Sequence, residues 1–535
     1  MKPSQAQTFV SEGWLAPLRH KVFRTLWLTW LTASICMWMN DVAAAWTMAT
    51  LTTSATLIAL VQTAASLPVL LLGVPSGALA DILNRKHYFI FAQIWLATNA
   101  TALMLFLVFG MLNPYVLLFL TFTNGIGLAM RWPIFAAIVP ELVPRESLSS
   151  ALALNAIAMN TSRIVGPLTA GAIIATAGSQ YVFALNMVLC VITSVVVMRW
   201  KYQGYISTLP GERFVGAMRV GMQYAWQSNR MRNIIFRAFL FFFQSTGLIA
   251  LLPVIAKTHL QGDAHTFTLL LACLGLGAIL AGSQLPRIRK YLKLNDLINY
   301  GLLILAFTSI GVVVATNVWL ASFWMLICGA AWIAIANSLT TAAQMTLPGW
   351  VRARGMSIYQ MGLMGGSAAG AGVWGKLADV YDVTTSIVLS SIFGLIVLLL
   401  LRKHRIDKHP LEDFTPVCPI ERPQPVSDID LKAGPVMISI EYHTLKEKAD
   451  EFKKLMAKSR KSRLKQGVLS WSLFEDTEHI GRFVEDFFFE SWADYLRRFD
   501  RFTTEDLNMQ EERHRYHIDA TPPKITRRIA AAIKD

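Results

Sequence analysis

The sequence reads Gly77-Ala78-Leu79-Ala80-Asp81-Ile82-Leu83-Asn84-Arg85-Lys86 at the end of its second long apolar segment. A segment that only crosses a bilayer needs apolar side chains, and a charge at its centre costs about 2.5–3.5 kcal/mol on insertion scales. This charged stretch therefore marks the point where the chain leaves the membrane. Its pattern decides which kind of membrane protein the apolar segments build.

Twelve such segments fill the chain from Leu26 to Leu401. A helix that crosses a hydrocarbon core of about 30 Å needs about 20 apolar residues. The composition agrees, because 54% of the 535 residues are hydrophobic and 16% are charged, against about 25% charged in soluble domains. The sequence predicts an all-α polytopic membrane protein with twelve transmembrane helices, at 26–49, 57–80, 88–110, 115–139, 151–177, 181–198, 234–256, 267–285, 297–315, 318–344, 356–378 and 384–401.

The formal charge of +15 follows the predicted topology. Lys and Arg crowd into alternate short loops and into the loop at 199–233, whereas the intervening loops contain Lys257 and little else that is basic. By the positive-inside rule, both termini and the long loop are cytoplasmic, in a multi-pass protein of the cell (inner) membrane. Met1–Lys21 has no cleavable signal pattern, so the first span is expected to direct insertion. Because topology accounts for the basic residues, we expect no nucleic-acid partner.

The long basic loop divides the spans six and six, and Arg287-Ile288-Arg289-Lys290 in the second half echoes Asn84-Arg85-Lys86 in the first. Duplicated halves are typical of secondary transporters. The predicted parts are a cytoplasmic segment at 1–22, a first six-helix half at 23–200, a cytoplasmic loop at 201–233, a second half at 234–402, a linker at 403–435 and a soluble domain at 436–535.

The tail from 436 onward alternates between strand and helix patterns. The predicted elements are strands at 436–442, 467–475 and 481–490 and helices at 446–459 and 492–501. The order β-α-β-β-α suggests a cytoplasmic α+β ferredoxin-like domain, and we expect it to form dimers with a regulatory or assembly role. The five cysteines and the tail histidines match no metal-ligand spacing, so we expect no metal and no cofactor.

The opening stretch resembles the cytoplasmic loop signature of the major facilitator superfamily, with Asn84 where that pattern often has glycine. Three further stretches, 139–146, 163–167 and 491–499, resemble the transmembrane secretion effector branch, which includes enterobactin-exporter-like permeases. The resemblance implies two six-helix halves that expose a substrate alternately to the two sides of the membrane. It also implies export, favoured by Gly166-Pro167 in the fifth span.

The resemblance also implies a gate. It assigns gating to Gly77, Asp81, Arg85 and Lys86, with the glycine-rich eleventh span, including Gly366 and Gly370, as the opposing surface, and Glu141 as a candidate partner of the basic pair. A carboxylate at Asp81 can accept hydrogen bonds from a neighbouring helix N-terminus and so act as a latch. The alternatives are a basic loop that only fixes topology and, for Glu141, a solvated carboxylate.

Three charges lie well inside predicted spans, where they are expected to face a cavity or each other: Asp41, Arg131 and Arg163. Asp41 and Arg163 lie at similar depth, and Asp41 is the only acidic residue well inside a span, so it is the candidate for proton coupling. A static Asp41–Arg163 pair that fixes helix packing is the alternative.

Substrate contacts are expected from residues near these charges. Arg131 with Trp132 offers planar donors and stacking area for an anion, and Arg163 adds a second cation. Trp38, Trp46 and Asn40 of the first span complete the candidates, although tryptophans also anchor helices at the interface and buried amides often join helices.

These features together predict a secondary transporter and not an enzyme. We expect a proton-coupled exporter of an amphipathic, anionic small organic molecule, such as a siderophore or drug. The alternative is a membrane-tethered enzyme or sensor that acts through the C-terminal domain.

Overall fold

The computed structural model describes residues 16–142, 147–200, 214–401, 406 and 429–531, and these form two compact units. Unit 1 comprises 1–205, 238–338 and 361–403, and unit 2 comprises 206–237, 339–360 and 404–535. Most of the predicted segment 1–22 and of the predicted linker 403–435 lies outside the described residues.

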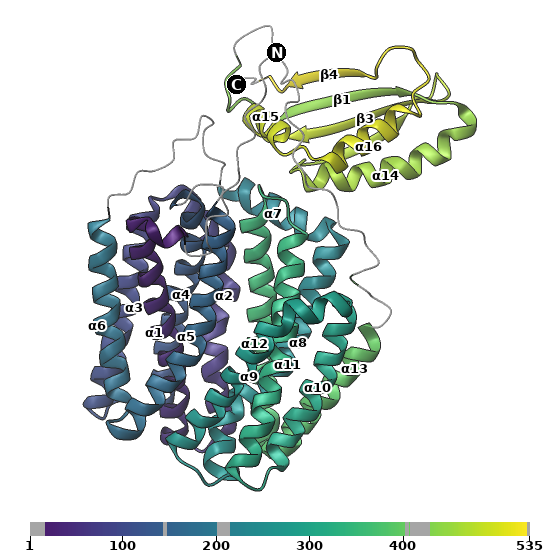
Figure 1. The fold of residues 1–535 in the computed structure, drawn as a ribbon. Coiled ribbons are helices and arrows are strands. Elements are labelled where there is room, and N and C mark those ends of the chain that lie inside the picture. The colour runs from purple at the N-terminus through teal and green to yellow at the C-terminus, as the bar shows by residue number, and fades with distance from the viewer. Residues whose placement is uncertain (1–15, 143–146, 201–213, 402–405, 407–428, 532–535) are drawn as a thin grey trace, which may run out of the picture. The chain divides into compact units, whose positions relative to one another are not determined.

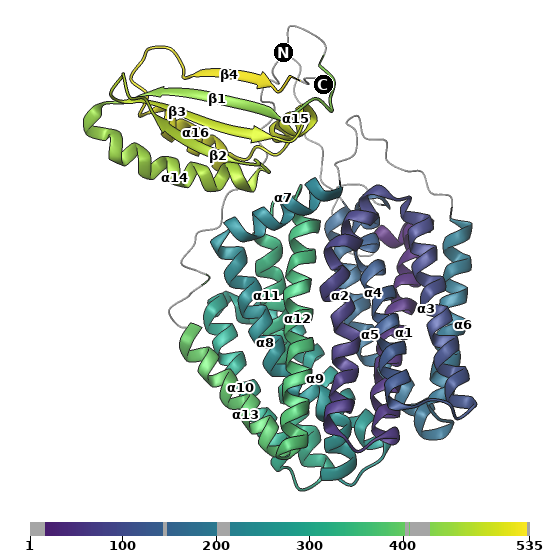
Figure 2. The same ribbon diagram turned by 180° about the vertical axis from the view of Figure 1, so that it is seen from behind.

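Unit 1 is helical, and its long helices run side by side (Figures 1 and 2). The first six are α1 (Lys21–Leu51), α2 (Ala55–Ile82), α3 (Arg85–Val108), α4 (Pro114–Leu142), α5 (Leu148–Thr176) and α6 (Ser179–Arg199). The second six are α8 (Asn229–Val254), α9 (Ala264–Tyr291), α10 (Leu294–Val314), α11 (Val318–Met345), α12 (Arg352–Val380) and α13 (Val383–Leu401). Helices α8, α11 and α12 contribute residues to both units.

Each predicted span overlaps one of these helices. Within the described residues, eight are long and apolar enough to cross a membrane by length and composition: α2, α3, α6, α8 with the π-helical turn that follows it, α9, α10, α11 and α13. That α1, α4, α5 and α12 also cross the membrane stays a prediction. The connection between α1 and α2, at Ser54, lies at one end of the helices of unit 1, and the connection between α2 and α3, at Asn84, lies at the other. We name these the Ser54 end and the Arg85 end.

Polar side chains and glycines join the helices within each half. The Gln93 side chain donates to Thr193 (2.6 Å), which links α3 to α6, and Thr123 donates to Asn99 (2.5 Å), which links α4 to α3. In the second half, a Cβ at Gly277 would overlap the carbonyl oxygen of Leu326. Glycine therefore lets α9 and α11 pack backbone to backbone, as small residues do between membrane helices.

Unit 2 contains one helix that the sequence analysis assigned to a loop, α7 (Phe214–Gln227), and an antiparallel four-stranded sheet. The sheet has the order β2-β3-β1-β4. Its elements are β1 (Val436–His443), α14 (Ala449–Lys465), β2 (Trp471–Glu475), β3 (Arg482–Phe489), α15 (Trp492–Asp500), α16 (Thr504–His514) and β4 (Lys524–Ile529). The five tail elements predicted from sequence overlap β1, α14, β2, β3 and α15, whereas α16 and β4 were not predicted.

One face of the sheet forms the core of this domain. Val436, Ile438, Ile440 and Tyr442 of β1 alternate inward and pack on Phe452 of α14, as the two-residue period of a strand requires. The helices lie on this face in both views (Figures 1 and 2). The domain therefore has one sheet face covered by helices.

A carboxylate is buried in the same core. Glu485 of β3 is fully buried and accepts two hydrogen bonds from Arg463 (3.1 and 3.2 Å) and one from Trp471 (2.8 Å). Burial alone would raise the pKa of Glu485, but the charges of Arg463 and Arg513 and these hydrogen bonds outweigh it, so the pKa falls to about 2. The core of the domain therefore contains an ionised carboxylate.

Candidate substrate site and gate

A single arginine lies where the two halves of unit 1 meet. The Arg163 guanidinium of α5 stands over the Trp38 ring of α1 (5.3 Å) and over the Trp332 ring of α11 (4.8 Å). Trp38 and Arg163 come close because α1 and α5 pack tightly at Gly166, where a Cβ would lie 2.5 Å from the Trp38 Cβ. Phe241 and Phe242 of α8 pack against the Trp332 ring. The cation is therefore framed by aromatic rings from both halves.

This cluster carries hydrogen-bond donors that no described residue accepts. They are Nε and Nη1 of Arg163 and the indole nitrogens of Trp38 and Trp332, all buried. A buried donor without an acceptor costs about 1–3 kcal/mol. Four such donors in one place suit a guest molecule that brings its own acceptors, such as a carboxylate or a hydroxylated ring.

Asp41 does not join this cluster. Within the described residues Asp41 and Arg163 form no ion pair, and the charge that acts on Asp41 is that of Arg131. Arg131 is 2% exposed; it donates to the Ala33 carbonyl (3.2 Å) and stands over the Trp30 ring (5.7 Å). Arg131 and Asp41 thus form a charge system within the first half, separate from Arg163.

The remaining cavity candidates occupy different places. Asn40 accepts a hydrogen bond from Asn186 of α6 (3.3 Å), which places it between helices of the first half. Trp46 stacks on Phe267 of α9, with ring centroids 5.8 Å apart. The side chain of Trp132 lies outside the described residues. Of the five candidates whose side chains are described, Trp38 and Arg163 lie together at the contact between the halves, and Trp46 meets the second half at a different helix, α9.

The Ser54 end of unit 1 is closed by Asp379 near the end of α12. Its carboxylate accepts hydrogen bonds from the backbone N–H of Ala55 (2.6 Å) and Thr56 (3.1 Å) and from the Ser54 hydroxyl (2.7 Å). An anion at a helix N-terminus satisfies orphan N–H groups and interacts favourably with the helix dipole. A side chain of the second half therefore caps a helix of the first half.

Other contacts close the same end. The Lys257 ammonium donates to the Ala49 carbonyl (2.6 Å), and Thr63 of α2 donates to the Ala368 carbonyl of α12 (2.8 Å). Gly375 lets α12 approach Ala59 of α2, because a Cβ at that glycine would lie 2.5 Å from the Ala59 Cβ. The halves are thus joined along α2 and α12 from the Ser54 end inward.

At the Arg85 end, the side chains of Asp81 and Glu141 lie outside the described residues, so their predicted gating contacts stay predictions. Gly77 is within α2, and Arg85 and Lys86 begin α3 with half-buried side chains. Asn84, where the superfamily pattern often has glycine, is the N-cap of α3: its side chain accepts from the N–H groups of Lys86 (3.0 Å) and His87 (3.4 Å). Asn84 therefore starts the helix that presents the basic pair.

The two glycines predicted to oppose the loop face another helix. A Cβ at Gly366 or Gly370 would overlap the carbonyl oxygen of Phe239 or Phe243, both in α8. Gly365, Gly372 and Gly375 face α2, through Leu70, Thr63 and Ala59. Gly366 and Gly370 thus pack α12 against α8.

Sequence reasoning missed Trp332, Asp379 and Lys257. Lys257 is the only Lys or Arg in the short loops on the side that the positive-inside rule assigns to the outside, and Asp379 directly follows a predicted span. Both positions could therefore have been singled out from the sequence. Trp332 had none, because a tryptophan inside a span carries no mark of which helix it faces.

Solved structures share the fold of the helical part. A nucleoside transporter, NupG, superposes with a TM-score of 0.59 at 12% identity, over 71% of this chain and 99% of that chain. A bacterial homologue of the human lysosomal transporter Spinster, inward-facing and unoccupied, gives 0.56 at 16% identity, over 73% and 98%. The fucose:proton symporter of E. coli gives 0.52 at 14% identity, over 74% and 100%.

Sequence relatives point to the branch of that fold. The staphyloferrin A transporter of Staphylococcus aureus is 22% identical over 282 residues, which is 52% of this chain and 70% of the relative. Macrolide efflux protein A of Streptococcus pyogenes is 23% identical over 273 residues, which is 51% of this chain and 67% of the relative. The model of the transmembrane secretion effector family matches residues 12–534. The protein therefore belongs to this family within the major facilitator superfamily, and it is a membrane transporter of small molecules.

Proposed function

We propose that the protein exports an amphipathic organic anion by alternating access, driven by proton antiport. The observation that carries this proposal is the Arg163 guanidinium between Trp38 and Trp332, with four buried donors for which no described residue provides an acceptor. A planar guanidinium binds a carboxylate through two parallel hydrogen bonds, and flanking indoles supply apolar area and N–H donors. A molecule with a carboxylate and a flat or apolar body satisfies all of these groups at once.

The names of the relatives fit this chemistry. One relative is named for staphyloferrin A and another for macrolide efflux. We therefore assign siderophores and drug-like molecules as the substrate classes to test first. An import direction is the competing proposal, and the transport experiment below distinguishes the two.

Alternating access follows from the closed end. We assign the Ser54 end to the outer side and the Arg85 end to the cytoplasm, because the basic loops gather at the Arg85 end. The described state is then closed to the outside, and opening it requires α12 to leave α2. Asp81, Arg85, Lys86 and Glu141 are the proposed latch on the opposite side.

Proton coupling is assigned to Asp41. The Asp41 carboxylate is the acidic group of the span interior, and Arg131 supplies the opposing positive charge. A carboxylate beside an arginine can exchange its proton when hydration of the site changes during the cycle. The measurement is substrate flux in proteoliposomes with and without an imposed pH gradient; flux that ignores the gradient rules out proton coupling.

The C-terminal domain is proposed to be ferredoxin-like and to dimerise. Its order of elements, β-α-β-β-α-α-β, and its sheet order β2-β3-β1-β4 agree with that architecture. The sheet face away from the helices carries Met437, Phe474, Val484 and Phe488. These apolar side chains lie on either side of a polar row that contains Ser439 and Asp486. We propose that a second copy of the chain covers them, and a monomer at all concentrations in analytical ultracentrifugation would exclude this dimer.

The transport experiment begins with the substrate. Metabolites and added drugs are compared between the medium of a strain that lacks the protein and one that expresses it, and the molecule that changes is loaded into proteoliposomes. Substrate that accumulates outside only when the protein is present supports export, whereas accumulation in the cells supports import.

Arg163 is then tested with that molecule. Arg163→Gln is expected to raise KM about fivefold, because charge-assisted hydrogen bonds are replaced by neutral ones worth about 1 kcal/mol less. Arg163→Lys keeps the charge without the planar fork and is expected to lie between the two. Arg287→Gln, which alters an exposed arginine at the end of α9, is the control. An unchanged KM in Arg163→Gln would remove this residue from the substrate site.

A further inference from the structure

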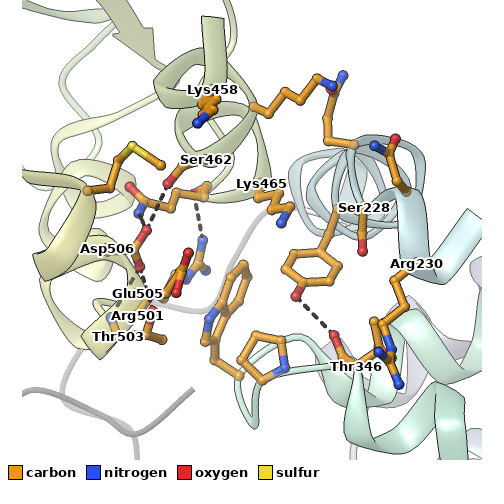
Figure 3. Close-up of a pocket in the computed structure, with 18 residues that line it drawn as sticks. Ser228, Arg230, Thr346, Lys458, Ser462, Lys465, Arg501, Thr503, Glu505 and Asp506 are labelled. Carbon is orange, nitrogen blue, oxygen red and sulfur yellow. Dashed lines mark hydrogen bonds between the residues drawn. The ribbon is translucent and has the colours of Figure 1, made fainter. Parts of the chain in front are cut away.

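A cavity of about 230 Å³ lies inside unit 2, apart from the Arg163 cluster (Figure 3). Its wall combines the end of α7 and the start of α8, the segment 346–350, the C-terminal half of α14 and the residues around the start of α16. The volume is just below the range of about 300–1,000 Å³ that is usual for ligand pockets. Elements far apart in the sequence therefore share one small space.

Positive charge dominates the lining. Five basic side chains and two carboxylates line the cavity. Lys458, Lys461 and Lys465 are three to four residues apart on α14, and this spacing places them on one face of the helix. Arg230 and Arg501 add charge from α8 and from the end of α15. A concave wall with one dominant sign of charge concentrates the counter-ion.

The Asp506 carboxylate in the lining is engaged by donors of the protein itself. The Asp506 carboxylate accepts hydrogen bonds from Ser462 (2.8 Å) and Gln466 (2.7 Å) of α14, and also from the hydroxyl and N–H of Thr503 (2.9 and 3.1 Å). It joins α14 to the start of α16, as Figure 3 shows. In contrast, Lys458 and Lys461 are exposed and make no ion pair with a described residue. The cavity thus keeps two lysines that a guest anion can engage.

Aromatic rings give the cavity a rigid wall. Tyr224 donates to the Thr346 carbonyl (3.1 Å) and meets Trp350 edge to face, with centroids 6.1 Å apart. Arg501 stands over the Trp350 ring (4.5 Å), and the Lys465 ammonium lies 5.8 Å from the centroid of Tyr224. These contacts hold two of the cations in place before any ligand arrives, which lowers the ordering cost of binding.

We propose that this cavity is a binding site for a small, multiply charged organic anion, a phosphate ester or a polycarboxylate. Two or more negative groups can engage Lys458 and Lys461 on one side while the arginines balance the rest of the charge. The small volume excludes a macromolecule. A lipid headgroup and a free metabolite share this chemistry, and the two arms of the experiment distinguish them.

The site also has a structural connection to transport. Asn229 and Arg230 line the cavity and belong to the first turn of α8, and Trp350 stands two residues before α12 begins. A bound anion therefore ties α14 to the starts of two helices that continue into the transporter. The inference concerns a regulatory ligand and does not depend on the proposed substrate or direction.

The test uses purified full-length protein in phosphatidylcholine nanodiscs. Pyrophosphate and citrate are titrated by calorimetry against the wild type, against Lys458→Ala/Lys461→Ala and against the control Lys448→Ala/Arg460→Ala. Both double variants remove two exposed positive charges, and alanine suits a helix. We expect one-site binding to the wild type and the control, and about fivefold weaker binding to the cavity variant, since charge-assisted contacts are lost.

The second arm repeats the titration in nanodiscs that also contain phosphatidylglycerol. Weaker apparent pyrophosphate binding there, in the wild type but not in the cavity variant, assigns the site to a lipid headgroup, and unchanged binding assigns it to a soluble anion. The proposal is overturned if neither probe binds in phosphatidylcholine, or if both double variants weaken binding equally. Hydrogen exchange of α14 checks that each variant is folded.

Discussion

Alanine at Glu485 is expected to unfold the C-terminal domain. Arg463 would keep its charge in a site where its side chain is 3% exposed, with no carboxylate opposite it. Breaking a buried ion pair by removing one partner costs about 3–5 kcal/mol, which is a large fraction of the stability of a small domain. Hydrogen exchange of β1 and β3 in the full chain measures the loss directly.

A matched control lies on the neighbouring strand. Glu441 of β1 also pairs with an arginine, Arg482 (3.0 Å), but the two side chains are 24% and 34% exposed. Because a solvent-exposed pair contributes about 0–1 kcal/mol, Glu441→Ala is expected to leave protection of the sheet nearly unchanged. Equal protection losses in the two variants would show that the burial of Glu485 does not matter.

The same carboxylate makes the domain sensitive to acid. Burial alone would raise the pKa of Glu485, but the charges of Arg463 and Arg513 and the hydrogen bonds from Arg463 and Trp471 lower it from the usual 4.5 to about 2. A lowered folded pKa stabilises the native state above the unfolded pKa. That contribution, about 3 kcal/mol, is lost as the pH falls from about 4.5 to about 2. The wild type should lose protection over this range, and Glu441→Ala should follow the same curve.

Asp379→Ala is expected to open the Ser54 end of the transporter. Loss of a capping side chain costs about 0.5–2 kcal/mol, and the carboxylate also accepts from the Ser54 hydroxyl. Since Asp379 is exposed, water screens part of this energy. We expect the open fraction to rise about tenfold, which corresponds to about 1.4 kcal/mol.

Labelling of a cysteine at Ala59 reports this opening. Ala59 is fully buried beside Gly375, so a membrane-impermeant maleimide reaches it only when α12 leaves α2. The five native cysteines are replaced first. Asp382→Ala is the control, because that carboxylate caps its own helix through Thr385 (2.8 Å) and not α2. Labelling that is no faster than in the control would reduce Asp379 to an ordinary helix end.

The sequence predicts well how deep in the membrane a residue lies, but it predicts poorly which neighbouring helix the side chain faces. Hydropathy located the long helices, since a run of about 20 apolar residues is easily recognised in a sequence. Depth also placed Asp41 and Arg163 at a similar level. Arg163 nevertheless stands over Trp38 and over Trp332 of the other half. The sequence alone could not show this, because it does not give the rotation of one helix against another.

The capping contact at Asp379 also became visible only in the structure. The principle that a carboxylate caps a neighbouring helix N-terminus predicts a latch at Asp81, whose side chain lies outside the described residues, and the structure shows such a contact at Asp379, at the opposite end of the helices. In the tail, β4 was missed because Lys524–Ile529 is largely exposed and lacks an apolar alternation. Helix α7 was missed because its basic residues were attributed to topology.

The backbone contact at Gly366 and Gly370 has a mechanical consequence. Where two helices touch without side chains between them, neither can slide or tilt far without the other. The parts of α8 and α12 that meet at these glycines therefore form one rigid pair of helices. We therefore expect any movement of α12 away from α2 at the Ser54 end to take this part of α8 with it, rather than to leave α8 in place.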